Sequence, residues 1–211
     1  MTEYAKSHPN WNRSQGPRIF PDLNPSEDLA YILGVLKGDG YVTKNGYQYN
    51  VCLQSISKNF VSSFETSLKN IGLHPCKIYH DRRGIYHSVA CSLQFVEFYK
   101  NLSMSRLKEL IAGYHSHFIK GLYESEGTLF IRGQTANFEL NIANSNLELL
   151  KIVSRYLFYK NIRNSIGKRG KTINDLQMYR LRVYTNDIPK FLDMINPCIK
   201  YLYLNKIVKD Y

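Results

Sequence analysis

Apolar and polar residues alternate along two stretches of the chain, one at residues 47–55 and one at residues 137–142. Alternation with a period of two is typical of a strand with one buried face. In the first stretch Tyr49, Val51 and Leu53 share one parity, and Gln48, Asn50, Cys52 and Gln54 share the other; in the second, Phe138, Leu140 and Ile142 alternate with Asn137, Glu139 and Asn141. We expect the apolar faces to cover helices and the polar faces to point outwards. Asn45-Gly46, just before the first stretch, predicts a two-residue hairpin turn.

A longer apolar stretch precedes each alternating one. Near the first, Ser26 is a suitable N-cap, and Glu27 and Asp28 place negative charge in the first turn, where the helix dipole favours it. The pattern therefore predicts a helix that starts near Glu27.

The two apolar stretches are copies of one motif. LAYILGVLKGDGYV, from Leu29, and SHFIKGLYESEGTLFI, from Ser116, share an apolar run, a glycine, and then an acid followed by glycine, so that Asp39 and Glu126 occupy the same place. Each acid-glycine pair leads into a hairpin, an alternating strand, a helix, further strands and a closing helical stretch. We divide the chain into an N-terminal extension (1–25), a first half-domain (26–112) and a second half-domain (113–211).

Small residues recur at helical spacing within both copies. Gly34 and Gly38 lie four residues apart, and Gly121 and Ser125 repeat this spacing. Because glycine inside a helix costs roughly 1 kcal/mol relative to alanine, such a stripe indicates close packing of another helix. The alternative interpretation is that these glycines are ordinary loop residues.

If the two helices pack on each other, their C-terminal ends bring two carboxylates together. Each carboxylate would also face the negative end of a helix dipole, which makes the pair unfavourable without a counter-ion. A divalent cation removes this cost, and Mg²⁺ is commonly held by one or two carboxylates together with water and substrate phosphates. The pattern therefore indicates phosphodiester cleavage.

The composition supports a polyanionic partner. The chain of 211 residues contains 28 Lys and Arg against 17 Asp and Glu, a formal net charge of +11, and both halves are basic. No apolar run approaches the roughly 20 residues of a membrane-spanning helix, and the N-terminus lacks the apolar core of a signal peptide. We expect a soluble, intracellular protein without a membrane partner.

ILGVLKGDG and IKGLYESEG resemble the two signature motifs of a monomeric LAGLIDADG homing endonuclease. The resemblance extends from about Ser26 onwards. It implies an α+β fold, a pseudo-twofold duplicated αββαββα unit with two saddle-shaped antiparallel sheets that lie in the DNA major groove. It also implies intron homing by a staggered double-strand break. Lys37 and Glu124 depart from the motif at its first acidic position.

The resemblance implies roles for individual residues. Asp39 and Glu126 would be catalytic metal ligands, with the backbone carbonyls of Gly38 and Ser125 completing the protein side. Gln54 and Asn144 match an auxiliary Gln or Asn near the scissile phosphates, with Ser55 as a competing alignment. Lys200 and Lys108 are alternative candidates for an assisting lysine. The expected cofactor is Mg²⁺, with Mn²⁺ possible, and Ca²⁺ should support binding without turnover because its looser geometry places the attacking water poorly.

The polar strand faces and the basic loops form the predicted surface for double-stranded DNA. Asn and Gln can pair with adenine and Arg with guanine in the major groove. The candidates are Thr43, Tyr47, Gln48, Asn50, Lys77, Tyr79, Arg82 and Arg83 in the first half, and Arg132, Gln134, Asn137, Glu139, Asn141, Lys168, Arg169, Lys171, Arg180 and Arg182 in the second. The alternatives are a solvated sheet face, solvated loop charges and, for the last two arginines, salt bridges on the far side of the sheet.

Strand length sets the size of the target. A strand over residues 47–55 spans about 30 Å, so each half could follow about 9 base pairs, and the different side chains of the two halves predict an asymmetric site. Site-specific endonuclease activity is the main hypothesis. A splicing maturase that binds RNA, or a DNA-binding regulator that does not cut, is the alternative. Retention of both acids favours cleavage and leaves a bifunctional protein open.

Overall fold

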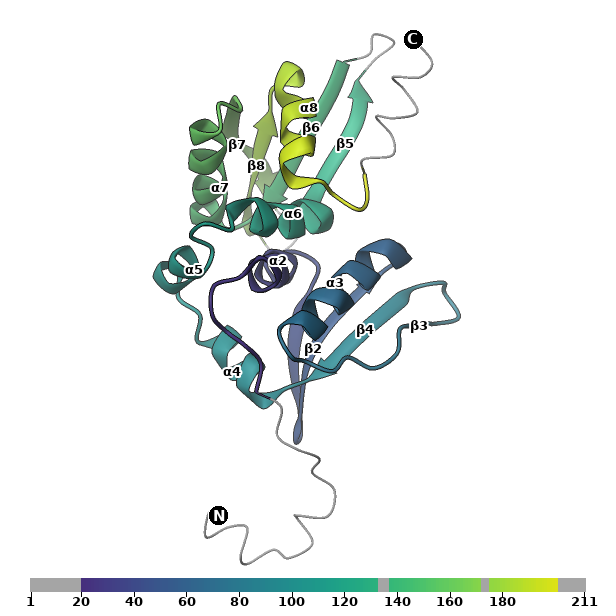
Figure 1. Cartoon of the computed structure of the whole chain (residues 1–211). Coiled ribbons are helices and arrows are strands. Elements are labelled where there is room, and N and C mark those ends of the chain that lie inside the picture. Colours follow the sequence, from purple (N-terminus) through teal and green to yellow (C-terminus); the bar gives the residue numbers. More distant parts are fainter. Residues whose placement is uncertain (1–19, 133–136, 172–174, 201–211) are drawn as a thin grey trace, which may run out of the picture.

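The structure is a computed structural model that describes residues 20–132, 137–171 and 175–200. Two consecutive sets of helices and strands make up the described part (Figure 1). The first comprises α2 (Glu27–Leu36), β1 (Tyr41–Asn45), β2 (Gln48–Ser55), α3 (Lys58–Asn70), β3 (Tyr79–His80), β4 (Tyr86–Cys91) and α4 (Leu93–Lys100). After α5 (Met104–Leu110), the second comprises α6 (His115–Glu126), β5 (Gly127–Arg132), β6 (Asn137–Asn144), α7 (Leu147–Tyr159), β7 (Asn164–Lys171), β8 (Gln177–Val183), a 3₁₀ turn η2 (Thr185–Asp187) and α8 (Ile188–Ile195). The predicted duplicated αββαββα order is confirmed.

Each half contains one four-stranded antiparallel sheet. The strand order is β1-β2-β4-β3 in the first half and β5-β6-β8-β7 in the second, so the topology is repeated as well as the element order. The repeat is unequal at the outer strand, because β3 has two residues where β7 has eight. The later strand pairs, which the sequence suggested to be similar, therefore differ in length.

Helix starts follow the local sequence. Ser26 caps α2 by accepting a hydrogen bond from Leu29 N at 3.2 Å, and α2 begins at Glu27 as expected. Ser57 and Asn146 cap α3 and α7 in the same way. These caps satisfy backbone N–H groups that have no partner inside the helix.

The first hairpin turn lies one residue later than predicted. Asn45 pairs with Gln48 across the hairpin, so the two turn residues are Gly46 and Tyr47. Gly46 has φ +57°, and no positive φ occurs at Tyr47. A positive φ at the first turn position only is the type II′ pattern, in which glycine is favoured at that first position.

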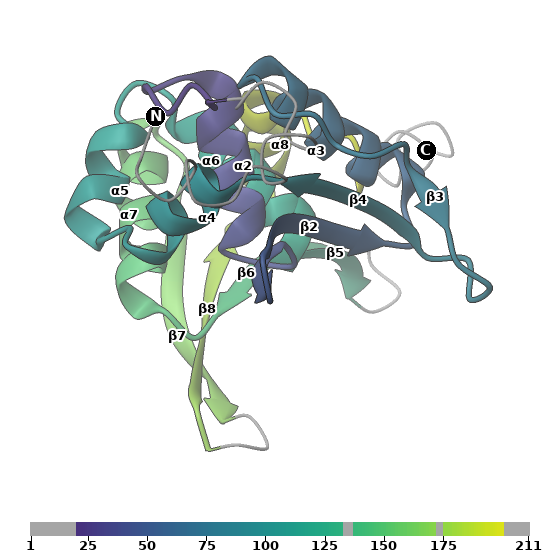
Figure 2. The ribbon, with the colours of Figure 1, turned by 90° about the horizontal axis from the view of Figure 1, so that it is seen from below.

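Alternation along the strands separates the core from the outer face. Val51 and Leu53 on β2, and Leu140 and Ile142 on β6, are completely buried against the helices. Figure 2 shows α2, α3, α6 and α8 on one side of the sheets. The expected apolar face under the helices is confirmed, whereas Cys52, Glu139 and Asn141, which alternation assigned to the outer face, are buried as well. No helix in the described ranges is long and apolar enough to cross a membrane.

Helices α2 and α6 pack against each other between the two halves (Figure 1). A Cβ atom on Gly34 would overlap the backbone oxygen of Phe118, and one on Gly121 would overlap the backbone oxygen of Tyr31. The two backbones therefore touch where the glycines lie. The predicted close contact through the small-residue stripe is confirmed.

Candidate active site

The two motifs meet at the ends of α2 and α6. Helix α2 ends at Leu36 and continues as a turn through Asp39, while Glu126 is the last residue of α6. A Cβ atom on Gly38 would lie 3.0 Å from Cγ of Glu126 and would overlap the side chain of Ser125. The glycine stripe thus brings the end of the first motif against the end of the second.

Both carboxylates contribute negative charge to this junction. Burial raises the pKa of Glu126, and the charge of Asp39 raises it further, whereas Lys200 and Arg169 act in the opposite direction. Asp39 itself is exposed. A cation between the two carboxylates would remove their repulsion, which is the arrangement that a divalent metal favours.

The donor set fits an open metal site. Across the described residues, no group of three or more His, Cys, Asp or Glu side chains converges. Two carboxylates with free positions for water and substrate oxygens suit Mg²⁺, which keeps much of its hydration shell. The residues present therefore fit Mg²⁺ bound jointly by protein and substrate.

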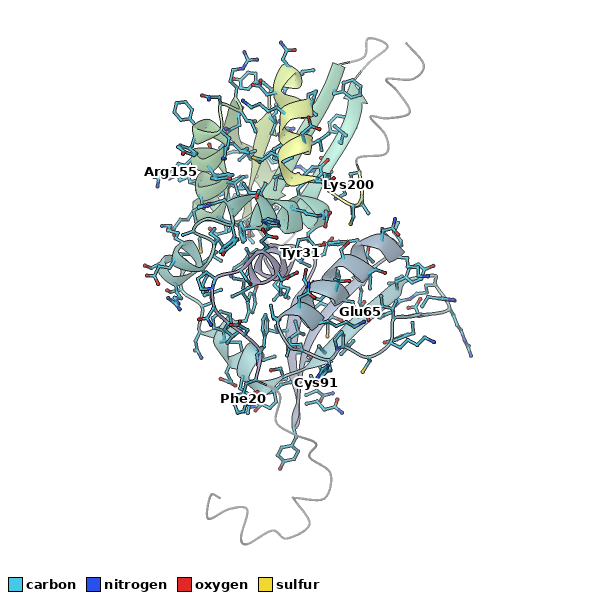
Figure 3. All side chains as sticks on the ribbon, in the orientation of Figure 1. Phe20, Tyr31, Glu65, Cys91, Arg155 and Lys200 are labelled. Atoms are coloured by element: carbon cyan, nitrogen blue, oxygen red, sulfur yellow. The ribbon has the colours of Figure 1, made fainter. Side chains whose placement is uncertain are left out.

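Lys200 reaches the same junction from the segment after α8 (Figure 3). Its Nζ lies 2.6 Å from the carbonyl oxygen of Gly127, 2.9 Å from that of Glu124 and 3.2 Å from those of Tyr123 and Ser125. Burial lowers the pKa of Lys200, and the nearby acids oppose that shift. The ammonium group neutralises the negative end of α6. The carbonyl of Ser125, a predicted metal ligand, accepts a hydrogen bond from this lysine.

Glu124 fixes the segment that carries Lys200. Its side chain is 1% exposed, and its two oxygens accept 2.6 Å hydrogen bonds from Tyr31 Oη and from Cys198 N. Burial and Glu124 raise the pKa of Tyr31, so its hydroxyl stays a donor. Glu124, which departs from the motif, therefore connects α2, α6 and the C-terminal segment through one buried carboxylate.

Replacing Glu124 by Leu should destabilise the protein by roughly 2–4 kcal/mol, because two buried donors lose a charged acceptor. Tyr31→Phe removes one of these hydrogen bonds and should cost less. Urea unfolding of the two variants checks this order. Equal stabilities of Glu124→Leu and the wild type would contradict the anchoring role.

The two auxiliary amides have different surroundings. Asn144 donates to the backbone oxygen of Lys37 at 3.1 Å, so it touches the end of the first motif from β6. Gln54 is exposed and donates to Tyr41 Oη at 2.6 Å. Ser55, the competing position, accepts from Ser57 N before α3 and so belongs to a turn. Catalytic roles for Gln54 and Asn144 stay predictions.

Lys108 and Lys37 have other partners. Lys108 on α5 pairs with Glu148 of α7 at 2.8 Å, and its role as an assisting lysine stays a prediction. The ion pair with α7 holds the Lys108 side chain at the surface. The residues next to Lys108 in the sequence did not indicate this pairing. Lys37 places its Nζ 4.8 Å from the centre of the Tyr99 ring, within the first half.

The first-half candidates for DNA contact lie partly on the strands and partly in the turns and loops between them. Tyr47 is 91% exposed at the hairpin tip, and Tyr79 is half exposed and stacks on His87 with ring centres 4.7 Å apart. Arg83 is held by Asp81 through hydrogen bonds of 2.7 and 2.9 Å, so it is already paired. The remaining candidates are Gln48, Lys77 and Arg82, which are exposed, and Thr43 and Asn50, which are half-buried.

The second-half face is less open than predicted. Glu139 and Asn141 are 3% and 4% exposed, and Asn141 donates to Glu139 at 3.2 Å, while Arg180 lies 3.6 Å from Glu139. The expectation that these two residues point freely outwards is wrong, because neighbouring long side chains on the same face cover them. Lys171 pairs with Asp175 at 2.6 Å.

The other second-half candidates divide into two groups. Lys168, Arg169 and Arg182 are exposed. Gln134 lies outside the described residues, as do the side chains of Arg132 and Asn137.

Tyr31 and Tyr99 make contacts that the sequence did not single out. Tyr31 donates to Glu124, and Tyr99 donates to the backbone oxygen of Leu36, at the end of α2, at 2.6 Å. The high tyrosine content of the sequence was a signal for such contacts, but it does not indicate which tyrosines make them.

Comparison with known proteins agrees with this geometry. The LAGLIDADG-like domain matches residues 26–102 and 113–196. An uncharacterized protein of Methanocaldococcus jannaschii, MJ0314, is 34% identical over 145 residues, which cover 64% of this chain and 55% of that protein. The chain thus spans about half the length of this curated relative.

Homing endonuclease I-DmoI of Desulfurococcus mucosus is 27% identical over 157 residues, covering 68% of this chain and 75% of that protein. The crystal structure of I-DmoI in complex with DNA and Ca matches with a TM-score of 0.62, covering 82% of this chain and 90% of that one. A full-length structure of WhiA shares the fold at 18% identity, with a TM-score of 0.58 and coverage of 94% and 63%. The chain therefore belongs to the LAGLIDADG family and contains the family's domain twice, in an arrangement that matches monomeric I-DmoI.

Proposed function

We propose that this protein is a site-specific, metal-dependent endonuclease that makes a staggered double-strand break in DNA. The observation that carries the proposal is the meeting of Asp39 and Glu126 at the ends of two closely packed helices. A protein that only bound DNA would gain nothing from carboxylates that repel phosphates. Similarity to I-DmoI supports the same activity.

In the proposed reaction, Asp39 and Glu126 would hold Mg²⁺ or Mn²⁺. A bound divalent ion supplies Lewis-acid stabilisation of phosphoryl charge and makes water a better nucleophile. Asn144, which touches the end of the first motif, is placed to orient a phosphate or water there. The charge of Lys200 offsets the negative helix end and stabilises charge that develops on phosphate oxygens.

The target is a long asymmetric duplex. The two sheets share a strand order but carry different accessible side chains on their polar faces, for example Gln48 and Asn50 against Arg182. The two halves in one chain provide both carboxylates, so a monomer is sufficient. We also propose an intracellular location and a role in the homing of an intron or intein, because a long duplex DNA site would be the substrate.

Binding should weaken as salt rises, since the basic chain displaces counter-ions from phosphates, with a log–log slope of about 0.9 per neutralised phosphate. A duplex selected from a randomised library by binding supplies the probe. Cleavage should require Mg²⁺ or Mn²⁺, whereas Ca²⁺ should support binding alone. Gel-shift titrations and cleavage assays over a salt series measure both.

Two outcomes would contradict the proposal. Cleavage that survives chelation of all divalent ions would remove the metal from the reaction. Tight duplex binding with no cleavage under any divalent ion would favour the alternative, a DNA-binding regulator.

A further inference from the structure

An exposed aromatic ring lies on the polar face of the second sheet. Phe130 on β5 is 44% exposed, although Leu129, the residue before it, packs against the core. In the register of the sheet Phe130 lies opposite Glu139 of β6, so the two side chains are on the same face. Leu129 and Leu140, the neighbouring pair, are on the opposite face under the helices. Phe130 therefore points to the side on which we expect DNA.

The accessible neighbours of Phe130 on this face are polar or basic. Glu139 itself is 3% exposed, because Asn141 donates to it and Arg180 lies against it. Arg182 is exposed on β8, opposite Asn141. In the row of Phe130 and Glu139, the ring rather than the carboxylate is thus available to a partner. A single exposed apolar side chain is ordinary on a protein surface, but on this face its partner has to offer an apolar group.

Base edges offer one apolar group in the major groove. Guanine and adenine present acceptors or an amino donor there, and cytosine presents an amino donor, whereas thymine has a methyl group beside its oxygen. A phenyl ring cannot hydrogen-bond, so placing it against another base would leave polar groups without partners. Contact with the thymine methyl instead removes apolar surface of both partners from water.

We propose that Phe130 reads one thymine of the DNA target through contact with its 5-methyl group. This inference rests on the proposed function, because it takes the polar faces of the sheets as the surface for duplex DNA, but it does not require cleavage. Phe130 is four residues after Glu126, or about 13 Å along an extended strand, which corresponds to roughly 4 base pairs. The thymine is expected at this distance from the cleavage site, in the half of the target that the second sheet contacts.

The first half does not repeat this contact. Thr43 lies four residues after Asp39 and pairs with Asn50, as Phe130 pairs with Glu139. A hydroxyl and an amide can both hydrogen-bond to base edges, and Asn suits adenine. The matching position of the other half-site should therefore prefer a different base. Reading of thymine by Phe130 would contribute to the asymmetry of the target.

The test replaces each thymine of the selected duplex, one at a time, by deoxyuridine, which lacks only the 5-methyl group. Gel shifts in Ca²⁺ measure the affinity of the full chain. For the wild type, one replacement at the expected distance from the cleavage site should weaken binding about fourfold, the effect of one buried methyl-sized group. Phe130→Ala should weaken binding to the unmodified duplex by at least that factor, and the same replacement should then have no further effect.

Phe158→Ala is the matched control. Phe158 is 81% exposed on α7, and this helix packs on the second sheet from the side opposite to Phe130. Loss of the Phe158 ring should change neither the duplex affinity nor the response to deoxyuridine. Phe130→Leu keeps an apolar side chain and should keep the sensitivity to the missing methyl group.

Two results would overturn the proposal. The first is a target in which no replacement of thymine by deoxyuridine weakens wild-type binding. The second is a response to deoxyuridine that is equally large in Phe130→Ala, because another residue would then read the methyl group. Duplex binding without cleavage in Mg²⁺ would contradict the endonuclease alone and leave this comparison valid, whereas failure to bind any duplex would overturn both.

Discussion

Asp39→Asn or Glu126→Gln is expected to lower the cleavage rate by a factor of roughly 10³ or more while changing duplex affinity little. In the proposed reaction the carboxylates would hold a cation that stabilises the transition state by several kcal/mol, and each 1.36 kcal/mol corresponds to tenfold in rate. Glu126→Gln also removes a partly buried charge whose pKa is raised by burial and by Asp39. Single-turnover cleavage and gel shifts on the selected duplex measure the two effects.

The pH dependence of stability gives an independent check on this site. A carboxyl group with a raised pKa in the folded state binds its proton more tightly there than in the unfolded chain, so its ionisation destabilises the metal-free protein as pH rises. Glu126→Gln should therefore be the more stable protein at neutral pH, and this advantage should vanish below the pKa of an unperturbed Glu. Mg²⁺ should raise the melting temperature of the wild type but not that of Glu126→Gln.

Glu97→Gln is the matched control for the charge. Glu97 is an exposed carboxylate on α4, and its replacement should affect neither cleavage nor the response to Mg²⁺. Full cleavage by either active-site variant would disprove the metal-ligand assignment, whatever the stability data show.

Gly34→Ala or Gly121→Ala should lower both stability and cleavage. The added Cβ would collide with the backbone of the opposite helix, at Phe118 or Tyr31 respectively, and backbone atoms cannot turn aside as a flexible side chain can. We expect a cost of about 2 kcal/mol or more, which is roughly 4–8 °C in melting temperature for a chain of this size. Cleavage should fall as well, because the helices that present the two carboxylates would separate.

Gly167→Ala separates this effect from glycine replacement in general. Gly167 lies on β7, and a Cβ there would meet nothing within 4 Å. Calorimetry of the three variants should show an unchanged or slightly raised melting temperature for Gly167→Ala. A melting temperature of Gly34→Ala equal to that of the wild type would show that the α2–α6 contact is looser than the structure indicates.

The positions of helices and strands were predictable because they follow local rules. A serine before two acids marks the start of α2, and alternation with period two identifies the residues of β2 and β6 that pack under the helices. The duplication of the motif indicated that two helices pack through glycines, so the pairing of Asp39 with Glu126 was within reach of the sequence. These features depend on residues that are close in the chain or repeated in it.

Other features depended on contacts between distant segments. Lys200 is 73 positions from Gly127, whose carbonyl it contacts at 2.6 Å, and the buried bond from Cys198 to Glu124 brings it there. Lys108 had equal standing as a candidate but pairs with Glu148 instead. The resemblance to the family predicted a lysine near the site, but only the packing of α8 and the segment after it determined which lysine reaches the carboxylate junction.

The sequence by itself determined the repeated fold, the helix contact and the two carboxylates, because periodicity, caps and a duplicated motif specify faces and ends of elements. The tertiary structure alone decided which polar side chains are free. Alternation places Glu139 and Asn141 on the outer face, but Arg180 of the neighbouring strand lies against Glu139, and both residues are buried. Whether a polar residue on a sheet face contacts solvent depends on the long side chains of adjacent strands, and the pairing of those strands is a non-local property.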